Sequence, residues 1–358
     1  MKQNKRKSII IIMSLLILLM VIGIVGYFLA QTRTMGKTDQ KAAEADSTAD
    51  DTDSDEDEED WSDGDEIALF FGDDYYSTSD DIKTYLFTGT DLSGSGIEAE
   101  DSADYEGSMA DFLLLAVENK TQSTYGFLQI DRNTITDVDV LDDKNESDGA
   151  ATEQICCAHW YGTNQEAGCQ NTVAAVEYLL GYLEIDGYYC MNMEDIAQLN
   201  QLVGGVEVTL EDDFTEVDPD MKVGETLTLD DQQAFHYIHD RINIADGTNA
   251  NRMKRQKTYL QAFLQKAKER IKEDPNSLND MIEGMEEIGQ TDISGRDISK
   301  LVNEMYQSDS MGILSFRGQT KEGNVLDDGE VHEEFYPEED SIIEVMCQLM
   351  NLQKDTDE

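Results

Sequence analysis

Basic residues are scarce in this chain. Lys and Arg together number 26 among 358 residues, against 77 Asp and Glu, so the formal net charge is −51. A protein that binds nucleic acid needs a positive surface to displace the counterions of the phosphate backbone. The deficit of bases therefore excludes nucleic acid as the main partner. It also excludes docking on anionic lipid through a polybasic surface.

Proline and cysteine are also rare. Three prolines and an apolar content of 39% argue against a chain that is disordered throughout. Five cysteines are too few for a disulfide scaffold, and the odd number leaves at least one thiol unpaired. Cys156 or Cys157 with Cys169 would close a loop of about a dozen residues, and a disulfide there outside the cell could contribute up to about 3 kcal/mol. The sequence does not decide whether these thiols are oxidised. Zinc is not expected, because no suitably spaced set of Cys and His accompanies these thiols.

Long apolar runs are absent except at the N-terminus. Residues 9–30 form an uncharged run of 22 residues, long enough to span a bilayer core as one helix. Bases within residues 1–8 precede it, so the positive-inside rule places that tail in the cytoplasm and the rest of the chain outside. A cleaved signal peptide is the alternative, but its apolar stretch is normally about 7–15 residues. We therefore expect a single-pass type II protein of the cell membrane, anchored in the lipid bilayer by this helix.

Residues 31–66 have the composition of a linker. The part from residue 42 to residue 66 holds 14 acidic residues and no basic one, among Ala, Ser, Thr and Gly. Like charges repel and nothing there can form a core, so the sequence predicts an extended, disordered tether. A calcium-binding patch is the alternative, but the acids lack the regular spacing of a dedicated site.

From residue 67 onward, strand-like and helix-like segments alternate. Strands are expected at 83–90, 111–118, 124–130 and 206–210, and helices at 171–183, 193–203 and 250–271. The continuous apolar run at 113–117 is typical of a strand that is covered on both faces. The pattern predicts an extracellular α/β domain over 67–274, with an α-β-α arrangement around a central mixed sheet. We expect residues 275–358 to form a helical extension packed on that domain.

Two carboxylates lie at the ends of expected strands. Asp91 follows the strand at 83–90, and Asp111 opens the next strand along the chain. If these strands are neighbours, the two side chains meet at one edge of the sheet, where oxygen ligands suit a hard cation. Asp at a strand end is also ordinary turn chemistry, so both interpretations stay open from the spacing alone.

A local excess of bases stands out in so acidic a chain. Residues 241–257 hold five bases and one acid. Arg252 and Gln256 fall on one face in the first turns of the helix expected at 250–271, with Arg255 beside them. A helix N-terminus favours an anion, and guanidinium groups match phosphate oxygens in pairs. The segment therefore indicates a phosphate site, with pairing to the protein's own carboxylates as the alternative.

Six short motifs follow one another along the domain. They are LFTGTD at 86–91, DFLL at 111–114, DRNT at 131–134, LVGGV at 202–206, YIHDR at 237–241 and RMKRQ at 252–256. In this order they resemble the LytR-CpsA-Psr family of bacterial envelope proteins. The resemblance covers roughly residues 85–264 and the anchor. It implies an extracellular α/β domain that attaches lipid-linked glycopolymers to the wall.

The resemblance also implies roles for individual residues. Asp91 and Asp111 match two acidic metal ligands for Mg²⁺, or Mn²⁺ in its place, and Arg132 joins them as a catalytic residue. The positions that match the binding of a polyprenyl pyrophosphate are Arg132, Arg241, Arg252 and Gln256, with His239 and Arg255 beside them. The implied reaction is a phosphotransfer, in which a sugar hydroxyl of peptidoglycan attacks the sugar-linked phosphorus and polyprenyl phosphate leaves.

The lipid part of such a carrier implies an apolar pocket. The residues considered for its lining, which are otherwise core, are Val173, Val176, Leu179 and Leu180. Four other positions depart from the family pattern: Met109, Asn133, His239 and Asn249 stand where the family often has Arg, Asp, Arg and Asp. These changes leave an alternative open, in which the protein is a catalytically degenerate, membrane-anchored module that binds polyprenyl phosphates or wall polymers.

Overall fold

The computed structural model describes residues 66–91, 108–274, 277, 280, 288–293 and 308–355. The apolar run at 9–30 and the acidic linker up to residue 65 lie outside the described residues. Among the residues that are described, no helix has both the length and the hydropathy needed to cross a membrane.

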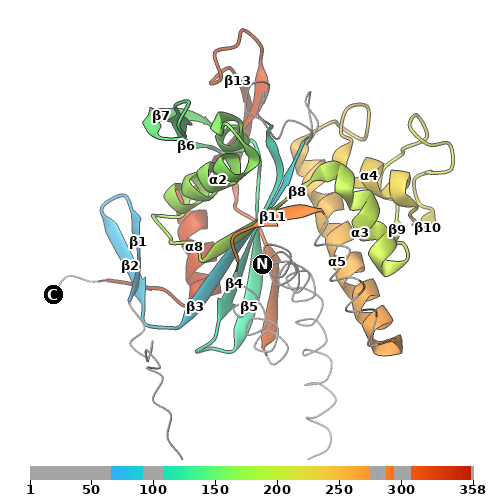
Figure 1. Ribbon diagram of the computed structural model, residues 1–358, viewed down its shortest axis with the longest axis horizontal. Coiled ribbons are helices and arrows are strands. Elements are labelled where there is room, and N and C mark those ends of the chain that lie inside the picture. The colour runs from blue at the N-terminus through green and yellow to red at the C-terminus, as the bar shows by residue number, and fades with distance from the viewer. Residues whose placement is uncertain are drawn as a thin grey trace, which may run out of the picture.

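A six-stranded mixed sheet forms the centre of the domain, in the order β11-β8-β3-β4-β5-β12 (Figure 1). Its strands are β3 (Ile82–Thr90), β4 (Ala110–Asn119), β5 (Thr124–Ile130), β8 (Gly187–Asn192), β11 (Gly289–Thr291) and β12 (Asp309–Leu314). β3, β4 and β5 form an antiparallel meander, whereas β8 pairs with β3 and β12 pairs with β5 in parallel. The predicted α/β fold with a central mixed sheet is therefore confirmed.

Helices cover both faces of this sheet (Figure 1). On one face lie α3 (Ile196–Val203), α4 (Asp231–His239) and α5 (Asn249–Glu273), and on the other lie η1 (Ile155–Tyr161), α2 (Gln165–Leu179) and α8 (Glu339–Met350). Each face has its own apolar core, because the side chains of a strand alternate between the faces. In β3, for example, Tyr85 and Phe87 join the core under α3 to α5, and Leu86 joins the core under α2 and α8.

The local sequence explains where these helices begin and end. Thr248 caps α5, because its hydroxyl accepts a hydrogen bond from the backbone N–H of Asn251. Asp230 and Gln233 form a reciprocal capping box at the start of α4. The helix expected at 193–203 opens with the short 3-10 turn η2 (Met193–Asp195), and it ends at Gly204, whose φ of +80° favours glycine.

Smaller sheets surround the central one. β9 (Glu207–Thr209) pairs with β10 (Thr226–Thr228), so the strand expected at 206–210 lies outside the central sheet. The other small sheets are β1 (Ile67–Phe71) with β2 (Asp74–Thr78) and β15 (Gln353–Lys354), β6 (Ile135–Leu141) with β7 (Ser147–Gln154), and β13 (Gly318–Gly323) with β14 (His332–Pro337).

The described residues of 275–358, the segment expected to be a helical extension, include strands as well as helix. β11 and β12 are the two edge strands of the central sheet, and α8 packs under β4 and β5. α8 is helical, as expected for this segment. The segment completes the domain, because without it β5 and β8 would be edges with unpaired backbone groups.

All five cysteines, which lie within the described residues, are free thiols. Cys156 faces Arg132, with 3.1 Å between its Sγ and the Arg132 Nη2. Cys169 lies instead beside His159 and Cys190. The pairing of Cys156 or Cys157 with Cys169 considered from the sequence is therefore not formed, because η1 and α2 direct Cys156 and Cys169 to different neighbours.

Candidate active site

The pairing of β3 with β4 brings the two predicted carboxylates together. Gly89 pairs with Phe112 and Thr90 with Ala110, so Asp111 is the extra residue of a β-bulge. Bulges turn a side chain away from its regular direction and are common beside active sites. Asp91 follows directly, with its backbone N–H bonded to the Met109 carbonyl. Carboxylate oxygens of Asp91 and Asp111 and a ring nitrogen of His239 all lie within 4.8 Å of one another.

Three cationic side chains surround the Asp111 carboxylate, whose side chain is only 3% exposed. Arg132 Nη1 forms an ion pair with Oδ1. Arg252 Nη1 lies 3.4 Å from Oδ2, and His239 Nε2 lies 3.8 Å from the same oxygen. Asp111 lies in β4, and its partners lie just after β5, at the start of α5 and at the end of α4. Asp111 and Arg252 are 141 positions apart in the sequence, so the fold brings the cluster together.

The register of the meander explains the position of Arg132. Leu113 pairs with Ile130 in the antiparallel β4–β5 ladder, so two residues further on Arg132 stands across from Asp111. Its Nη2 donates to Met109 Sδ at 3.0 Å and to Cys156 Sγ at 3.1 Å. Met109, where the family often has arginine, thus contributes a weak acceptor that holds Arg132 instead of a second guanidinium.

A buried polar bridge holds Arg252. Asn249 Nδ2 donates to Asp131 Oδ1 at 2.6 Å, and Asn249 Oδ1 accepts from Arg252 Nε at 3.0 Å and Nη2 at 2.7 Å. An amide donates and accepts at once, whereas an ionised Asp at position 249 would only accept and would repel Asp131. Burial raises the pKa of Asp131, against the lowering effect of its hydrogen bonds from Asn133 and Asn249.

His239, which stands where the resemblance implies an arginine, is held in place from two sides. Its ring stacks on Phe235, with 4.6 Å between the ring centroids, and its Nδ1 lies 3.1 Å from Asp240 Oδ1. The hydrogen bond to Asp240, helped by the charges of Asp111 and Asp91 and opposed by burial, raises the pKa of His239 above its usual 6.5. The imidazole therefore retains positive charge at a higher pH than a free histidine.

The other predicted phosphate ligands differ in position. Arg241 is partly exposed at the rim, with its Nη1 3.9 Å from Glu333 Oε2. Arg255 is buried beneath the site, where its Nη2 donates to the Asp240 carbonyl at 2.5 Å and its guanidinium lies over Phe214. The structure therefore brings Arg132, Arg252 and His239 to Asp111, and it places Arg255 under Asp240, the residue that follows His239 at the end of α4.

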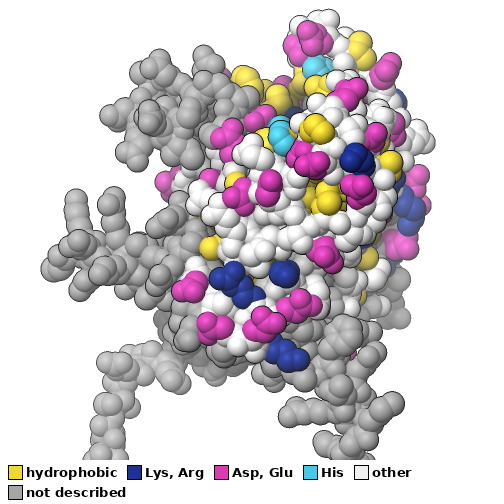
Figure 2. All heavy atoms as spheres, turned by 90° about the vertical axis from the view of Figure 1, so that its right-hand side faces the viewer, with side chains coloured by type: hydrophobic (Ala, Val, Ile, Leu, Met, Phe, Trp, Pro, Cys, Tyr) yellow, Lys and Arg dark blue, Asp and Glu magenta, His cyan; other side chains and the backbone are white. Residues whose placement is uncertain are grey.

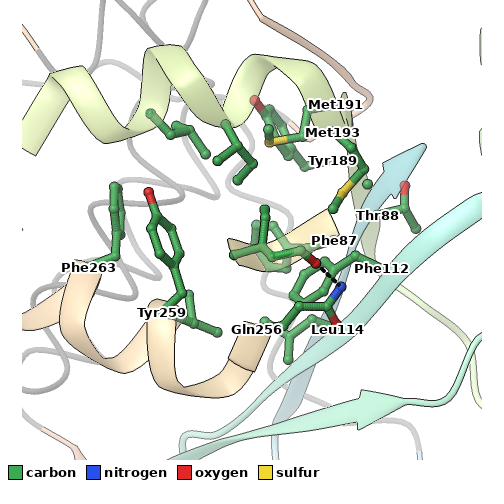
Figure 3. A pocket seen from close by; sticks show the side chains of 15 residues that line it. Phe87, Thr88, Phe112, Leu114, Tyr189, Met191, Met193, Gln256, Tyr259 and Phe263 are labelled. Carbon is green, nitrogen blue, oxygen red and sulfur yellow. Dashed lines mark hydrogen bonds between the residues drawn. The ribbon is translucent and has the colours of Figure 1, made fainter. Parts of the chain in front are cut away.

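An apolar pocket opens beside this cluster, between the sheet and helices α3 and α5 (Figure 3). Its lining is chiefly aromatic and aliphatic, and includes Phe87, Phe112, Leu114, Tyr189, Met191, Met193, Tyr259 and Phe263. Gln256 is one of its few polar side chains, and it is held by Gln129 and by the Ile238 carbonyl.

Three residues that line the pocket lie next to, or one helical turn from, residues of the charged cluster in the sequence. Phe112 follows Asp111, Ile238 precedes His239, and Gln256 lies one helical turn after Arg252. The residues proposed from sequence for the pocket are not in it. Val176 and Leu180 are buried in the core under α2 on the opposite face of the sheet, with Val173 and Leu179 partly buried against it.

The surface around α3 to α5 carries no continuous basic area. Figure 2 shows acidic side chains scattered over this face and basic ones in small groups. The positive charges that matter for an anion are therefore the partly or wholly buried groups around Asp111, where screening by salt is weaker than at the surface.

The donor set fits a hard cation. Two carboxylates are the ligands that Mg²⁺ and Mn²⁺ prefer, and Asp91 and Asp111 lie close enough to share one ion. Sequence reasoning missed the supporting residues Asp131 and Asp240. Both residues lie within the six motifs, in DRNT and in YIHDR, but the sequence assigns neither a role. Asn249, the partner of Asp131, is 118 positions away.

Several solved structures share the fold of this chain. Protein gbs0355 from Streptococcus agalactiae is 18% identical with a TM-score of 0.58, covering 75% of this chain and 86% of its own. TagV from B. subtilis is 21% identical (TM-score 0.54, 75% and 96% covered), and TagT bound to LI-WTA is 20% identical (TM-score 0.53, 76% and 90% covered). At these identities the structures show a shared fold alone. No curated protein sequence matches the chain.

A sequence model of the LytR_cpsA_psr family matches residues 33–346, which is most of the chain and includes the whole site. The protein therefore belongs to the LytR-CpsA-Psr family, whose members attach glycopolymers to the cell wall.

Proposed function

We propose that the protein is a Mg²⁺-dependent phosphotransferase that moves a glycopolymer from a polyprenyl-pyrophosphate carrier to peptidoglycan. Residues 9–30 anchor it in the cell membrane, and the α/β domain works on the outer side, where carrier and wall meet. Family membership supports glycopolymer attachment, and TagT bound to LI-WTA, a structure of the same fold, supports a wall polymer as the ligand.

One observation carries the proposal. A buried carboxylate held by Arg132, Arg252 and His239 lies next to an apolar pocket, so a phosphate-binding cluster and a lipid-binding surface adjoin. A polyprenyl pyrophosphate has this combination of chemistry, since its anionic head continues directly into an apolar chain. The aromatic lining offers the chain contacts without hydrogen-bonding demands.

The chain's own groups serve positioning and charge neutralisation, which phosphoryl transfer needs more than covalent chemistry. Arg132 and Arg252 present preorganised donors, and the Asn249 bridge keeps Arg252 in one orientation. Asp91 and Asp111 would hold Mg²⁺, which supplies neutralisation of the phosphate charge when bound. Each charge-assisted contact with phosphate contributes about 1.5–3 kcal/mol.

The alternative is a degenerate module that binds the carrier or wall polymers without transfer. The observation that favours it is the loss of two guanidinium groups, at Met109 and His239, relative to the family pattern. Both replacements nevertheless interact with the site, because Met109 contacts Arg132 and His239 faces Asp111.

A transfer assay separates the two functions. Full-length protein in detergent is mixed with labelled polyprenyl-linked polymer, peptidoglycan and Mg²⁺, and label on the wall fraction is counted. We expect Asp91→Ala to abolish transfer without lowering the thermal unfolding temperature, while Asp220→Ala, which removes an exposed loop carboxylate, retains it. Full transfer by Asp91→Ala would contradict the role of Asp91, and no transfer by the unaltered chain with any polymer would favour the binding module.

A further inference from the structure

A second cluster of metal-ligating side chains lies away from Asp111, inside the core under α2. His159 from η1, Cys169 from α2 and Cys190 from β8 bring one nitrogen and two sulfurs within 4.8 Å of one another. All three residues are at most 1% exposed. Three elements that are separate in sequence thus converge on one buried point, which no pattern of spacing along the chain revealed.

The orientation of His159 is fixed by its other ring nitrogen. Nδ1 lies 3.1 Å from both the carbonyl and the hydroxyl oxygen of Ser108. The carbonyl can only accept, so the tautomer with the proton on Nδ1 satisfies it, and the hydroxyl can accept as well. Nε2 then presents its lone pair to the two sulfurs. A histidine that binds a metal almost always donates its remote N–H to a carbonyl or carboxylate in this way.

The backbone is shaped to bring this ring close. A Cβ atom at Gly168 would lie 2.9 Å from the Nδ1 and Cε1 atoms of His159 and 2.7 Å from its carbonyl oxygen. Only glycine at this position lets the first turns of α2 approach η1 so closely, and the next residue is the ligand-bearing Cys169. The close approach therefore serves the cluster directly.

The distances match those around a zinc ion. His159 Nε2 lies 3.7 Å from Cys169 Sγ and 3.9 Å from Cys190 Sγ. With Zn–S of about 2.3 Å and Zn–N of about 2.0–2.1 Å, tetrahedral to trigonal angles separate nitrogen and sulfur by about 3.6–3.8 Å. Two thiolates would also balance the charge of a divalent ion, so the filled site would be neutral in an apolar surrounding.

A fourth donor is close to Cys190. Thr88 is 3% exposed, and within the part of the chain that the structure describes its hydroxyl oxygen has no hydrogen-bond partner. Thr88 pairs with Cys190 in the parallel β3–β8 ladder, which places the two side chains beside each other on the same face of the sheet. An unpartnered buried hydroxyl is costly in an apolar core, which a bond to a metal ion would relieve.

We propose that His159, Cys169 and Cys190 bind zinc as a structural site, with the Thr88 hydroxyl placed to complete the coordination. The ion joins η1, α2 and the central sheet. η1 in turn supports the active site, because Cys156 accepts from Arg132 and its backbone N–H bonds the Arg132 carbonyl. Zinc therefore holds the surface against which Arg132 is positioned, a role that is independent of the proposed reaction.

Metal analysis of the full-length protein tests this site. The protein is purified in detergent under reducing conditions, in an Asp91→Ala background that weakens the carboxylate site. We expect close to one zinc ion per chain. Replacement by Co²⁺ should give thiolate-to-metal charge-transfer absorption, which a carboxylate site does not produce, and a strong chelator should lower the unfolding temperature.

Matched cysteine variants locate the ion. Cys190→Ser should weaken zinc affinity by more than about 100-fold, beyond the 10–100-fold typical of outer-shell changes, whereas Cys347→Ser, in α8, should leave it unchanged. If the serine variant does not fold, the zinc count and the Co²⁺ spectrum of the native chain decide alone. Zinc-free protein with free thiols, or with Cys169 and Cys190 joined as a disulfide, and without the Co²⁺ band, would overturn the proposal.

Discussion

Asp111 is the residue around which the charges of the site are arranged. It is buried with three cationic partners, and removal of any one of them leaves a carboxylate that is less well neutralised. The carboxylate and its partners were predictable from the sequence as members of one site, because each stands in a recognisable motif. Their mutual distances were not, since they depend on a β-bulge and on the approach of α5.

The raised pKa of His239 gives the site a pH dependence. A raised pKa means that the imidazolium persists above pH 6.5, and its attraction for a phosphate is lost as the pH rises through that raised value. We expect the affinity for inorganic pyrophosphate, measured by calorimetry without metal, to fall over this range.

The variant His239→Arg is the control for this experiment. Pyrophosphate itself changes protonation with pH, and this change affects both proteins equally, so the difference between their affinities reports the imidazole. The variant should bind more tightly at alkaline pH, by about 10-fold or more for a recovered charge-assisted contact. Its affinity should also lack the part of the pH dependence that comes from deprotonation of His239. Identical pH profiles for the two proteins would show that His239 does not contact the phosphate.

At the scale of elements, the long and strongly patterned segments were the predictable ones. β5 has the predicted bounds, and α5 differs by one or two residues at its ends. α4 was missed, because it is short and polar and only its capping box marks it. β8 was missed because it is buried on both faces and so shows no alternation of polar and apolar residues.

Asp80 joins elements that no sequence pattern associates. Its Oδ2 accepts from Asn119 at 2.8 Å, Gln122 at 3.1 Å and Asn351 at 3.0 Å, which ties the loop before β3 to the end of β4 and to the residue after α8. We expect Asp80→Ala to lower the free energy of unfolding by about 1–2 kcal/mol, measured by urea denaturation, whereas Asp73→Ala, in an exposed turn, should have little effect.

The pKa of Asp80 predicts how the difference in unfolding free energy between wild type and Asp80→Ala changes with pH. Desolvation opposes ionisation of Asp80, but the hydrogen bonds from three amides outweigh it and lower its pKa below 3.8. The stabilisation by Asp80 is therefore fully present above the pKa that this residue has in the unfolded chain. It is lost as the pH falls through the lowered pKa of the folded state. A difference between wild type and Asp80→Ala that stays constant down to pH 2 would contradict this assignment.

At the scale of the whole molecule, the domain is closed by its last residues. β12 pairs with β5, and α8 buries Val345, Met346 and Leu349 in the core under α2. The sequence suggested an addition to a finished domain because the region carries no motif. Long-range pairing between segments some 185 positions apart leaves no local signal.

Truncation tests that description. Deletion of residues 308–358 should abolish cooperative thermal unfolding, since it exposes the core under α8 and leaves β5 as a bare edge. Deletion of residues 356–358 should not change the unfolding temperature. A shortened chain that still unfolds cooperatively would show that the segment is an accessory after all.

The central claim is that one site holds the head of a polyprenyl pyrophosphate through arginines and a shared cation. The most direct test is the affinity of the full-length protein in detergent for polyprenyl pyrophosphate, titrated with and without Mg²⁺, for the unaltered chain, Asp91→Ala and Arg252→Gln. Arg270→Gln, at the far end of the same helix, is the control. We expect tight, Mg²⁺-dependent binding that is lost in the two site variants and kept in the control. Binding that is indifferent to Mg²⁺ and to Asp91, or no binding at all, would contradict the account.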